Sequence, residues 1–249
     1  MISLVLLLLS TAARAQDNYE IQVYGSDLVA PNQTMVELHS NIAFSNSQIQ
    51  AEGVRPADHA FHETIEVTHG FNSWMEVGVY FFNSLGSDDR TTYVGSHLRP
   101  RFAVPPSFNW PVGVSLSLEA GYQKREYSED DWTLEIRPII DKQWGKWYFA
   151  FNPTFDHALH GYNSGNGFNF SPNLKINFSF SAWLASGIEY YGSVGPLTAP
   201  QSWSNQQQQV FVVSDLNVSP FWELNMGYGI GFTESTVSPI LKWIVGYRF

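Results

Sequence analysis

Charged side chains recur at every second position in several segments, and this spacing is the first feature of the chain that could do chemistry. Arg99 and Arg101 are two residues apart in one segment, Glu135 and Arg137 in another, and Glu119 lies in a segment between them. Alternate residues of an extended chain point to one side, so neighbouring strands would bring these acidic and basic groups together. Opposed charges of this kind orient polar solutes in pores. As ion pairs, the same residues would instead fill and stiffen an interior, and the spacing is compatible with both readings.

The same alternation adds histidines and further carboxylates to this inward set. A charge facing lipid costs about 2–4 kcal/mol for Arg or Lys, so turning the charged face inward is favourable if the apolar faces meet a membrane. The residues expected to line an interior, with a constriction among them, are Arg99, Arg101, Glu119, Glu135, Arg137, Glu66, His62, Glu37 and His39.

Nucleophilic and metal chemistry find little support in the sequence. A Ser–His pair on one strand needs His-x-Ser spacing, which none of the seven histidines shows, and His39 and Ser40 are adjacent and so point to opposite faces. A Ser–His pair formed across two strands stays open as an alternative. Asp156, His157 and His160 could hold a divalent ion, but this set is not specific. We therefore expect no catalytic residues, no metal site and no cofactor.

The elements that position these side chains are twelve segments with alternating apolar and polar residues, each of which predicts a strand with one face of each kind. The alternation is weakest in 91–104 and 208–218. The predicted strands are 33–45, 60–70, 73–83, 91–104, 112–124, 131–142, 145–156, 167–179, 182–191, 208–218, 220–232 and 236–249.

The connections between these segments alternate between longer polar loops and tight turns. Six of the nine tryptophans lie at or beside the tight turns: Trp74, Trp110, Trp144, Trp147, Trp183 and Trp222. Short turns at one end, long loops at the other and aromatic girdles at both are typical of bacterial outer-membrane barrels. The predicted fold class is therefore all-β, an antiparallel transmembrane β-barrel of about twelve strands, and a soluble sandwich is the disfavoured alternative.

Composition excludes several classes of protein. The 249 residues include 13 Lys and Arg against 23 Asp and Glu, which gives a formal charge of −10, and there is no cysteine. An acidic chain lacks the basic face that nucleic-acid binding requires. Without cysteine there are no disulfides, thiolate metal sites or Cys nucleophiles.

The first residues have the features of a targeting segment. Ile2 to Leu9 are almost all apolar, and Ala13-Arg14-Ala15 offers a small-x-small cleavage site, so residues 1–15 are predicted to be a signal peptide. Residues 16–32 are expected to form an N-terminal periplasmic segment before the barrel of 33–249. Residues 17–30 also alternate, and two interpretations of them stay open: a short ordered tail, which is slightly preferred, or a piece that folds into the barrel mouth and narrows it.

The last strand ends with aromatic or apolar residues at every second position: Phe249, Tyr247, Val245 and Trp243. This pattern resembles the C-terminal signal by which bacterial outer-membrane barrels are recognised by their assembly machinery. The segments His62–Gly70 and Gly246–Phe249 give a looser resemblance to uncharacterised outer-membrane barrels of the phenol-degradation MetA-pathway type. That resemblance implies passage of small molecules.

These observations lead to one expected function and two alternatives. We expect an outer-membrane barrel that acts as a passive channel or transporter for small solutes and is not an enzyme. The alternatives are a closed structural or surface-recognition barrel and, less favoured, an outer-membrane lipid hydrolase. The expected partners are outer-membrane lipid, the barrel assembly machinery and small solutes, without nucleic acid.

Overall fold

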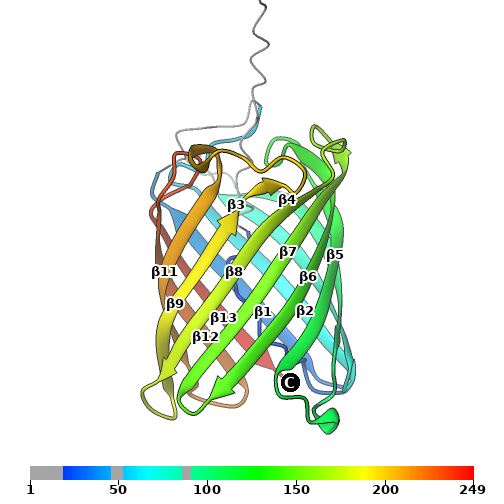
Figure 1. The fold of residues 1–249 in the computed structure, drawn as a ribbon, viewed down its shortest axis with the longest axis vertical. Coiled ribbons are helices and arrows are strands. Elements are labelled where there is room, and N and C mark those ends of the chain that lie inside the picture. Colours follow the sequence, from blue (N-terminus) through cyan, green and yellow to red (C-terminus); the bar gives the residue numbers. More distant parts are fainter. Residues whose placement is uncertain (1–18, 46–52, 86–90) are drawn as a thin grey trace, which may run out of the picture.

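The alternating segments form an antiparallel sheet that closes on itself as a barrel (Figure 1). The structure is a computed structural model that describes residues 19–45, 53–85 and 91–249. The twelve strands of the barrel wall are β1 (Thr34–Ala43), β2 (Phe61–Asn72), β3 (Met75–Leu85), β4 (Thr91–Ala103), β5 (Gly113–Gln123), β6 (Asp130–Trp144), β7 (Trp147–Gly161), β8 (Phe168–Ser179), β9 (Leu184–Ser193), β11 (Gln207–Leu216), β12 (Trp222–Gly231) and β13 (Ile240–Arg248).

Each strand pairs with its sequence neighbours, and the first and last strands close the ring. β1 pairs with β13 from Met35 opposite Arg248 to Ala43 opposite Ile240. The predicted all-β, antiparallel barrel of about twelve strands is thus confirmed. A closed ring leaves no strand edge unpaired, which a lipid environment requires because it offers no hydrogen-bond partners.

Three short elements lie outside the wall. Strand β10 (Gly195–Pro196) adds to the edge of β8, and the 3₁₀ turns η1 (Pro106–Phe108) and η2 (Trp203–Asn205) lie in connections. Alternation could not predict them, because two or three residues carry no period. Within the described residues, no helix has the length and apolar character needed to cross a membrane.

The two ends of the barrel differ, as the predicted connections suggested. Tight turns join β2 to β3, β6 to β7 and β8 to β9 at the end where the C-terminus lies, and most of the longer connections gather at the opposite end (Figure 1). The connection from β4 to β5, which contains η1, is the long one at the C-terminal end. We call these the turn end and the loop end. The predicted signal peptide, residues 1–15, lies outside the described residues.

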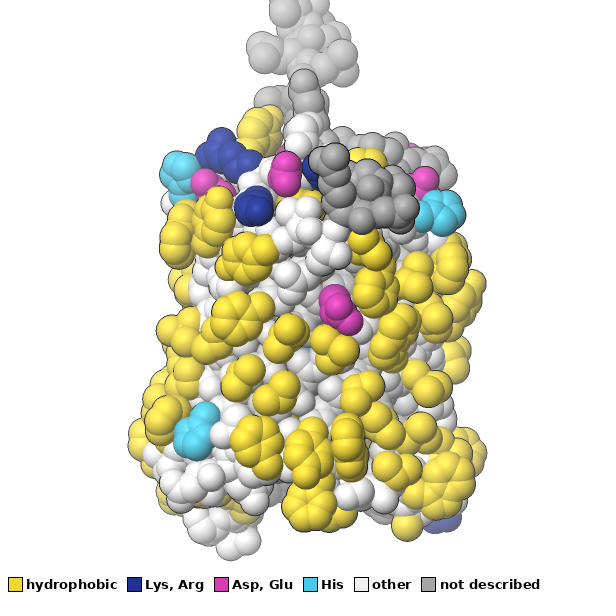
Figure 2. All heavy atoms as spheres, turned by 180° about the vertical axis from the view of Figure 1, so that it is seen from behind, with side chains coloured by type: hydrophobic (Ala, Val, Ile, Leu, Met, Phe, Trp, Pro, Cys, Tyr) yellow, Lys and Arg dark blue, Asp and Glu magenta, His cyan; other side chains and the backbone are white. Residues whose placement is uncertain are grey.

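Apolar side chains cover the outside of the wall. Ile65 and Leu98 point outward and are 41% and 52% exposed, whereas their polar neighbours in sequence, Thr64 and Glu66, His97 and Arg99, are buried. Figure 2 shows these apolar side chains spread around one face of the barrel, with most charged groups in view confined to its loop end. An outer surface of this kind suits hydrocarbon, and it leaves the inside of the barrel to polar groups.

Candidate functional site

The inward faces of the strands bring charged and polar side chains into a narrow lumen. The predicted lining residues all lie on these faces, and eight of the nine are buried, with Glu135 partly buried. These residues are Arg99, Arg101, Glu119, Glu135, Arg137, Glu66, His62, Glu37 and His39. Groups of opposite charge meet here in an interior that is already filled by side chains.

The first cluster of charges joins β4 to β2 and β3. The guanidinium of Arg99 pairs with Glu66, and its Nη2 lies 3.7 Å from Oε1 of Glu76. Nε of Arg101 lies 2.8 Å from the same Glu76 oxygen. The imidazole Nε2 of His39 lies 3.2 Å from Oε2 of Glu66. The cluster therefore links four adjacent strands through buried ion pairs.

Glycine at position 78 explains why Arg99 reaches so far. Gly78 lies directly between Arg99 and Thr68 in the register of β4, β3 and β2. A Cβ at Gly78 would lie 3.2 Å from Nε of Arg99 and 2.7 Å from Oγ1 of Thr68. Because no side chain stands there, the guanidinium crosses β3 and reaches Glu66 on β2.

The second cluster lies on β4, β5 and β6. Nδ1 of His97 lies 2.5 Å from Oε1 of Glu119, and Nε of Arg137 lies 2.7 Å from Oε1 of Glu135. The expected pairing of Arg99 and Arg101 with these two carboxylates is therefore not what the structure shows. Both arginines turn toward β3 instead, and His97 takes Glu119.

A segment of the chain that precedes β1 fills the lumen. Residues 19–30, here called the lumen segment, run inside the barrel from the loop end, beside Thr64, to the turn end, beside Gly70 (Figure 1). The described part of the predicted N-terminal segment thus lies among the lumen side chains, and the preferred expectation of a short tail does not describe it. The alternative, in which this piece enters and narrows the barrel, describes the position of these residues.

In the half of the lumen segment nearer the loop end, wall side chains bind the backbone of the segment. Oγ1 of Thr64 donates to the carbonyl of Tyr19 at 2.7 Å, and Nζ of Lys242 donates to the carbonyl of Ile21 at 2.7 Å. The side-chain amide of Asn152 both accepts from the N–H of Tyr24 at 2.7 Å and donates to its carbonyl at 3.0 Å. These bonds satisfy a buried backbone that belongs to no sheet.

In the half of the lumen segment nearer the turn end, wall side chains bind the backbone in the same way. Arg101 donates to the carbonyls of Gly25 and Asp27 at 3.0 and 2.6 Å. The N–H of Val29 donates to Oε2 of Glu76 at 2.6 Å. At Gly70 on the wall, a Cβ would lie 2.2 Å from the carbonyl oxygen of Val29, so only glycine allows the segment to lie this close to β2.

Tyr24 occupies the centre of the arginine cluster. The guanidinium carbons of Arg99, Arg137 and Arg101 lie 4.8, 5.0 and 5.7 Å from the centroid of its ring. Its hydroxyl contacts Glu20 and lies 3.1 Å from the hydroxyl of Tyr80. Cation–π contacts of this kind are worth about 2 kcal/mol when desolvated, so one ring links the arginines of two strands.

Apolar residues of the lumen segment create a small hydrophobic cluster inside the polar lumen. Ile21 and Val23 pack against Val237 in the connection before β13 and against inward-facing residues of several strands: Ala150, Tyr191, Phe211, Val213 and Ile240. This explains the weak alternation of 208–218, because β11 meets lipid with one apolar face and the lumen segment with the other. Tyr24, Glu76, Lys242 and this cluster are not among the residues expected to form the constriction, although the alternation places Glu76 and Lys242 inward.

The remaining candidates lie at the two rims. At the loop end, His160 lies 2.6 Å from Asp131 and Nδ1 of His157 lies 3.0 Å from the carbonyl oxygen of Gly167, so these histidines do not share a ligand set with Asp156. At the turn end, Tyr247 and Phe249 are exposed on the outside and their rings stack at 6.3 Å. Val245 and Trp243 continue the same outward row and are partly buried.

Comparison with known proteins identifies the fold. No protein family and no curated protein matches the sequence. The outer-membrane channel COG4313 of Pseudomonas putida F1 has a similar structure, with a TM-score of 0.58 and 11% identity over 92% of this chain and 100% of that one. The NanC porin matches with a TM-score of 0.57 and 8% identity over 86% and 98% of the two chains, and the KdgM porin with a TM-score of 0.53 and 9% identity over the same shares.

These likenesses show a fold shared with bacterial outer-membrane channels and porins. They agree with the exposed apolar surface, which is the surface that an outer-membrane barrel turns to lipid. The chain is thus an outer-membrane β-barrel with a porin-like architecture. The lumen segment and the charged clusters around it are the features from which a more specific function must be argued.

Proposed function

We propose that this barrel is a passive channel for small polar solutes, in which the lumen segment limits passage. The observation that carries this proposal is that part of the filling of the lumen is a stretch of chain separate from the wall. A barrel of twelve strands is wider than the eight-stranded barrels that side chains alone can fill. When the lumen segment moves, the charged clusters become the lining of a water-filled path.

The charges of the lining support a preference among solutes. Acidic groups outnumber basic ones on the inward faces, even though Arg99, Arg101 and Arg137 face Tyr24. Asp141 accepts hydrogen bonds from Ser26 and Tyr148 and forms no ion pair with a described residue, so it adds an uncompensated carboxylate to the lining. We expect small cations and polar solutes with a cationic group to pass more readily than anions, since rings of carboxylates favour cations.

The proposal contains no catalytic step. The expectation that the chain is not an enzyme rests on the absence of His-x-Ser spacing in the sequence. Among the buried histidines, His39 and His97 each face a carboxylate, that of Glu66 and that of Glu119.

Single-channel recording in planar bilayers tests the proposal. The mature chain should give small stepwise conductances, and a variant that lacks residues 16–30 should give steps several-fold larger, because the lumen then holds only wall side chains. Heat-modifiable migration on a gel verifies that both proteins are folded barrels. Folded barrels that give no steps in either form would contradict a channel and favour the closed structural barrel.

A further inference from the structure

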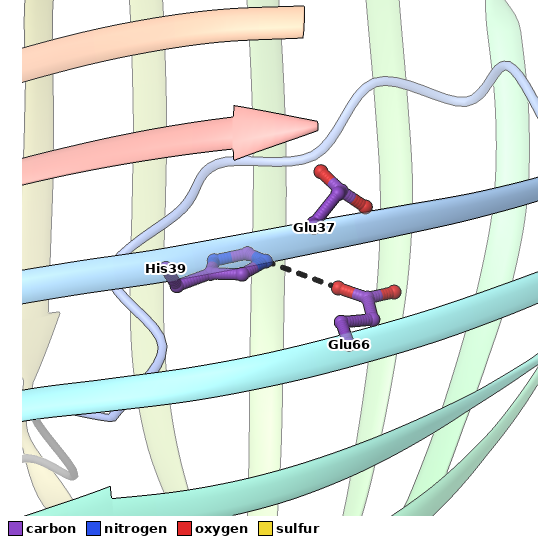
Figure 3. Close-up of side chains that lie close together, drawn as sticks. All are labelled: Glu37, His39 and Glu66. Carbon is purple, nitrogen blue, oxygen red and sulfur yellow. Dashed lines mark hydrogen bonds and ion pairs between the residues drawn. The ribbon is translucent and has the colours of Figure 1, made fainter. Parts of the chain in front are cut away.

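Two carboxylates and an imidazole lie together on the inner wall of β1 and β2. Glu37 and His39 are two residues apart on β1, and Glu66 lies directly opposite Glu37 on β2 (Figure 3). One ligand atom from each of the three side chains lies within 4.8 Å of the others, and all three residues are buried. Among the residues that the structure describes, no other set of three potential metal ligands meets this spacing.

Glu37 is the unexplained member of this cluster. Its side chain is 5% exposed, yet within the described residues it accepts no hydrogen bond and forms no ion pair. Carboxylates directly opposite each other on paired strands repel, and a buried charge without a partner is costly. A cation would stabilise the lumen-facing carboxylate of Glu37, and no side chain of the described residues supplies one at hydrogen-bonding distance.

The charges around the cluster support the same conclusion. Arg99 pairs with Glu66, Arg101 pairs with Glu76, and Arg248 lies 2.5 Å from Glu223 on the other side of Glu37. Each nearby guanidinium therefore already faces a carboxylate of its own. Glu37 is the one carboxyl group of this set that no described side chain pairs with.

Glu66 and His39 are already arranged as ligands. One carboxylate oxygen of Glu66 is held by Arg99 and by Oγ1 of Thr68, which donates at 2.6 Å. Its other oxygen faces Nε2 of His39 at 3.2 Å. Tetrahedral ligands at 2.0–2.1 Å from a metal lie about 3.4 Å apart, so these two atoms already have that spacing.

The third ligand, Glu37, lies next to a glycine of the neighbouring strand β13. Its side chain lies over Gly246 of β13, where a Cβ would come within 2.9 Å of Cγ of Glu37. Binding of a cation requires the Glu37 side chain to rotate toward the other two ligand atoms, a change between staggered rotamers that leaves the backbone in place.

We propose that Glu37, His39 and Glu66 form a binding site for a divalent transition-metal cation of the Zn²⁺ class. Imidazole and carboxylate ligands together suit zinc, nickel and copper, and three protein ligands leave a fourth position for water or a solute group. The cation replaces the hydrogen bond between His39 and Glu66 and compensates the charge of Glu37. Arg99 stays on the other oxygen of Glu66 and orients it, in the manner of an outer-sphere partner.

Binding of Zn²⁺ to the purified mature chain, made without a histidine tag and treated with EDTA, tests the proposal. Competition with a chromophoric chelator measures the affinity and number of sites. The wild-type protein should bind one Zn²⁺ that Glu37→Gln and His39→Gln each weaken by about tenfold or more. The proposed channel function does not enter this measurement, so its failure and that of the site are distinguishable.

Glu119→Gln is the matched control, because Glu119 is a buried carboxylate of the same lumen that faces a histidine but lies outside the cluster. It should leave the Zn²⁺ site unchanged. Absorption spectroscopy at the zinc edge should show imidazole and oxygen ligands in the wild type and lose that signature in Glu37→Gln. A wild-type protein without such a site, or a Glu37→Gln protein that binds like the wild type, would overturn the proposal.

Discussion

The side-chain amide of Asn152 pairs with the backbone of Tyr24 as a neighbouring strand would, accepting from its N–H and donating to its carbonyl. Asn152 is fully buried on the inward face of β7, and both side-chain hydrogen bonds join it to the lumen segment, which is not part of the wall. The inner wall is therefore built to receive the lumen segment by its main chain, which gives several ways to release that segment without removing it.

Replacing Asn152 should loosen the lumen segment. Asn152→Ala leaves the buried N–H and carbonyl of Tyr24 without partners, which costs about 1–3 kcal/mol for such a group. We expect larger or more frequent conductance steps than in the wild type.

The matched control is Asn173→Ala. Asn173 lies directly opposite Asn152 on β8, but its amide donates to Thr154 and Ser171 and not to the lumen segment. If both substitutions change conductance equally, the pairing with Tyr24 is not what closes the lumen.

A methyl group at position 70 should displace the segment by contact alone. In Gly70→Ala the new Cβ meets the carbonyl oxygens of Val29 and Ala30 at 2.2 and 2.5 Å, so the backbone of the segment has to shift. The chain has no cysteine, which makes a single Val23→Cys substitution a clean reporter, and Val23 is 4% exposed. Thiol labelling of this position should become faster in the Gly70→Ala background.

Gly165→Ala is the control, since a Cβ there has nothing within 4 Å. Equal labelling rates in the Gly70→Ala, Gly165→Ala and parent proteins would show that the close approach at Gly70 does not position the segment.

Removing a lumen arginine should change ion selectivity. Arg99→Ala or Arg137→Ala takes a positive charge from the lining and leaves a carboxylate partner, so the reversal potential in a salt gradient should shift toward cations. The loss of one partner from a buried pair also costs about 3–5 kcal/mol, so the folded state of each variant must be verified. Arg125→Ala removes the same charge from an exposed position beside Asp131 and should leave selectivity unchanged. Unchanged reversal potentials in both lumen variants would argue against these residues as the lining of the path.

The C-terminal aromatic pattern gives a prediction about assembly. Phe249→Ala should lower the amount of barrel inserted in the outer membrane, if assembly factors read the terminal residue together with Tyr247. Phe180→Ala removes a similarly exposed ring from the same end of the barrel, 61% against 65% exposed, and should have little effect. The heat-modifiable fraction in membrane extracts measures both, and equal losses would point to a general role of rim aromatics.

Much of the wall could be predicted from alternation because the period of a strand is fixed by its geometry. The expected segment 60–70 corresponds to β2, Phe61–Asn72, and its inward residues His62 and Glu66 follow from that period. The physical reason is that a strand with lipid on one side and a polar lumen on the other must sort its residues every two positions.

Contacts within the lumen could not be predicted in this way. The reach of Arg99 to Glu66 depends on the absence of a side chain at Gly78 and on the register of three strands, neither of which a single strand encodes. The position of the lumen segment is even harder to predict from the sequence. Ile21 and Val23 alternate like a strand, but they are buried by packing inside the barrel and not by pairing within its sheet.

The seam between β1 and β13 has a consequence for the order of folding. These strands join the two ends of the sequence, so their pairing closes the longest loop in the chain and carries the largest entropic cost of any strand pair. The lumen segment, residues 19–30, lies shortly before β1 in the sequence and is enclosed when β1 pairs with β13. Closure of the barrel and enclosure of the lumen segment are thereby coupled. A variant in which the lumen segment cannot bind to the inner wall should therefore refold at a different rate, even where the folded barrel is equally stable.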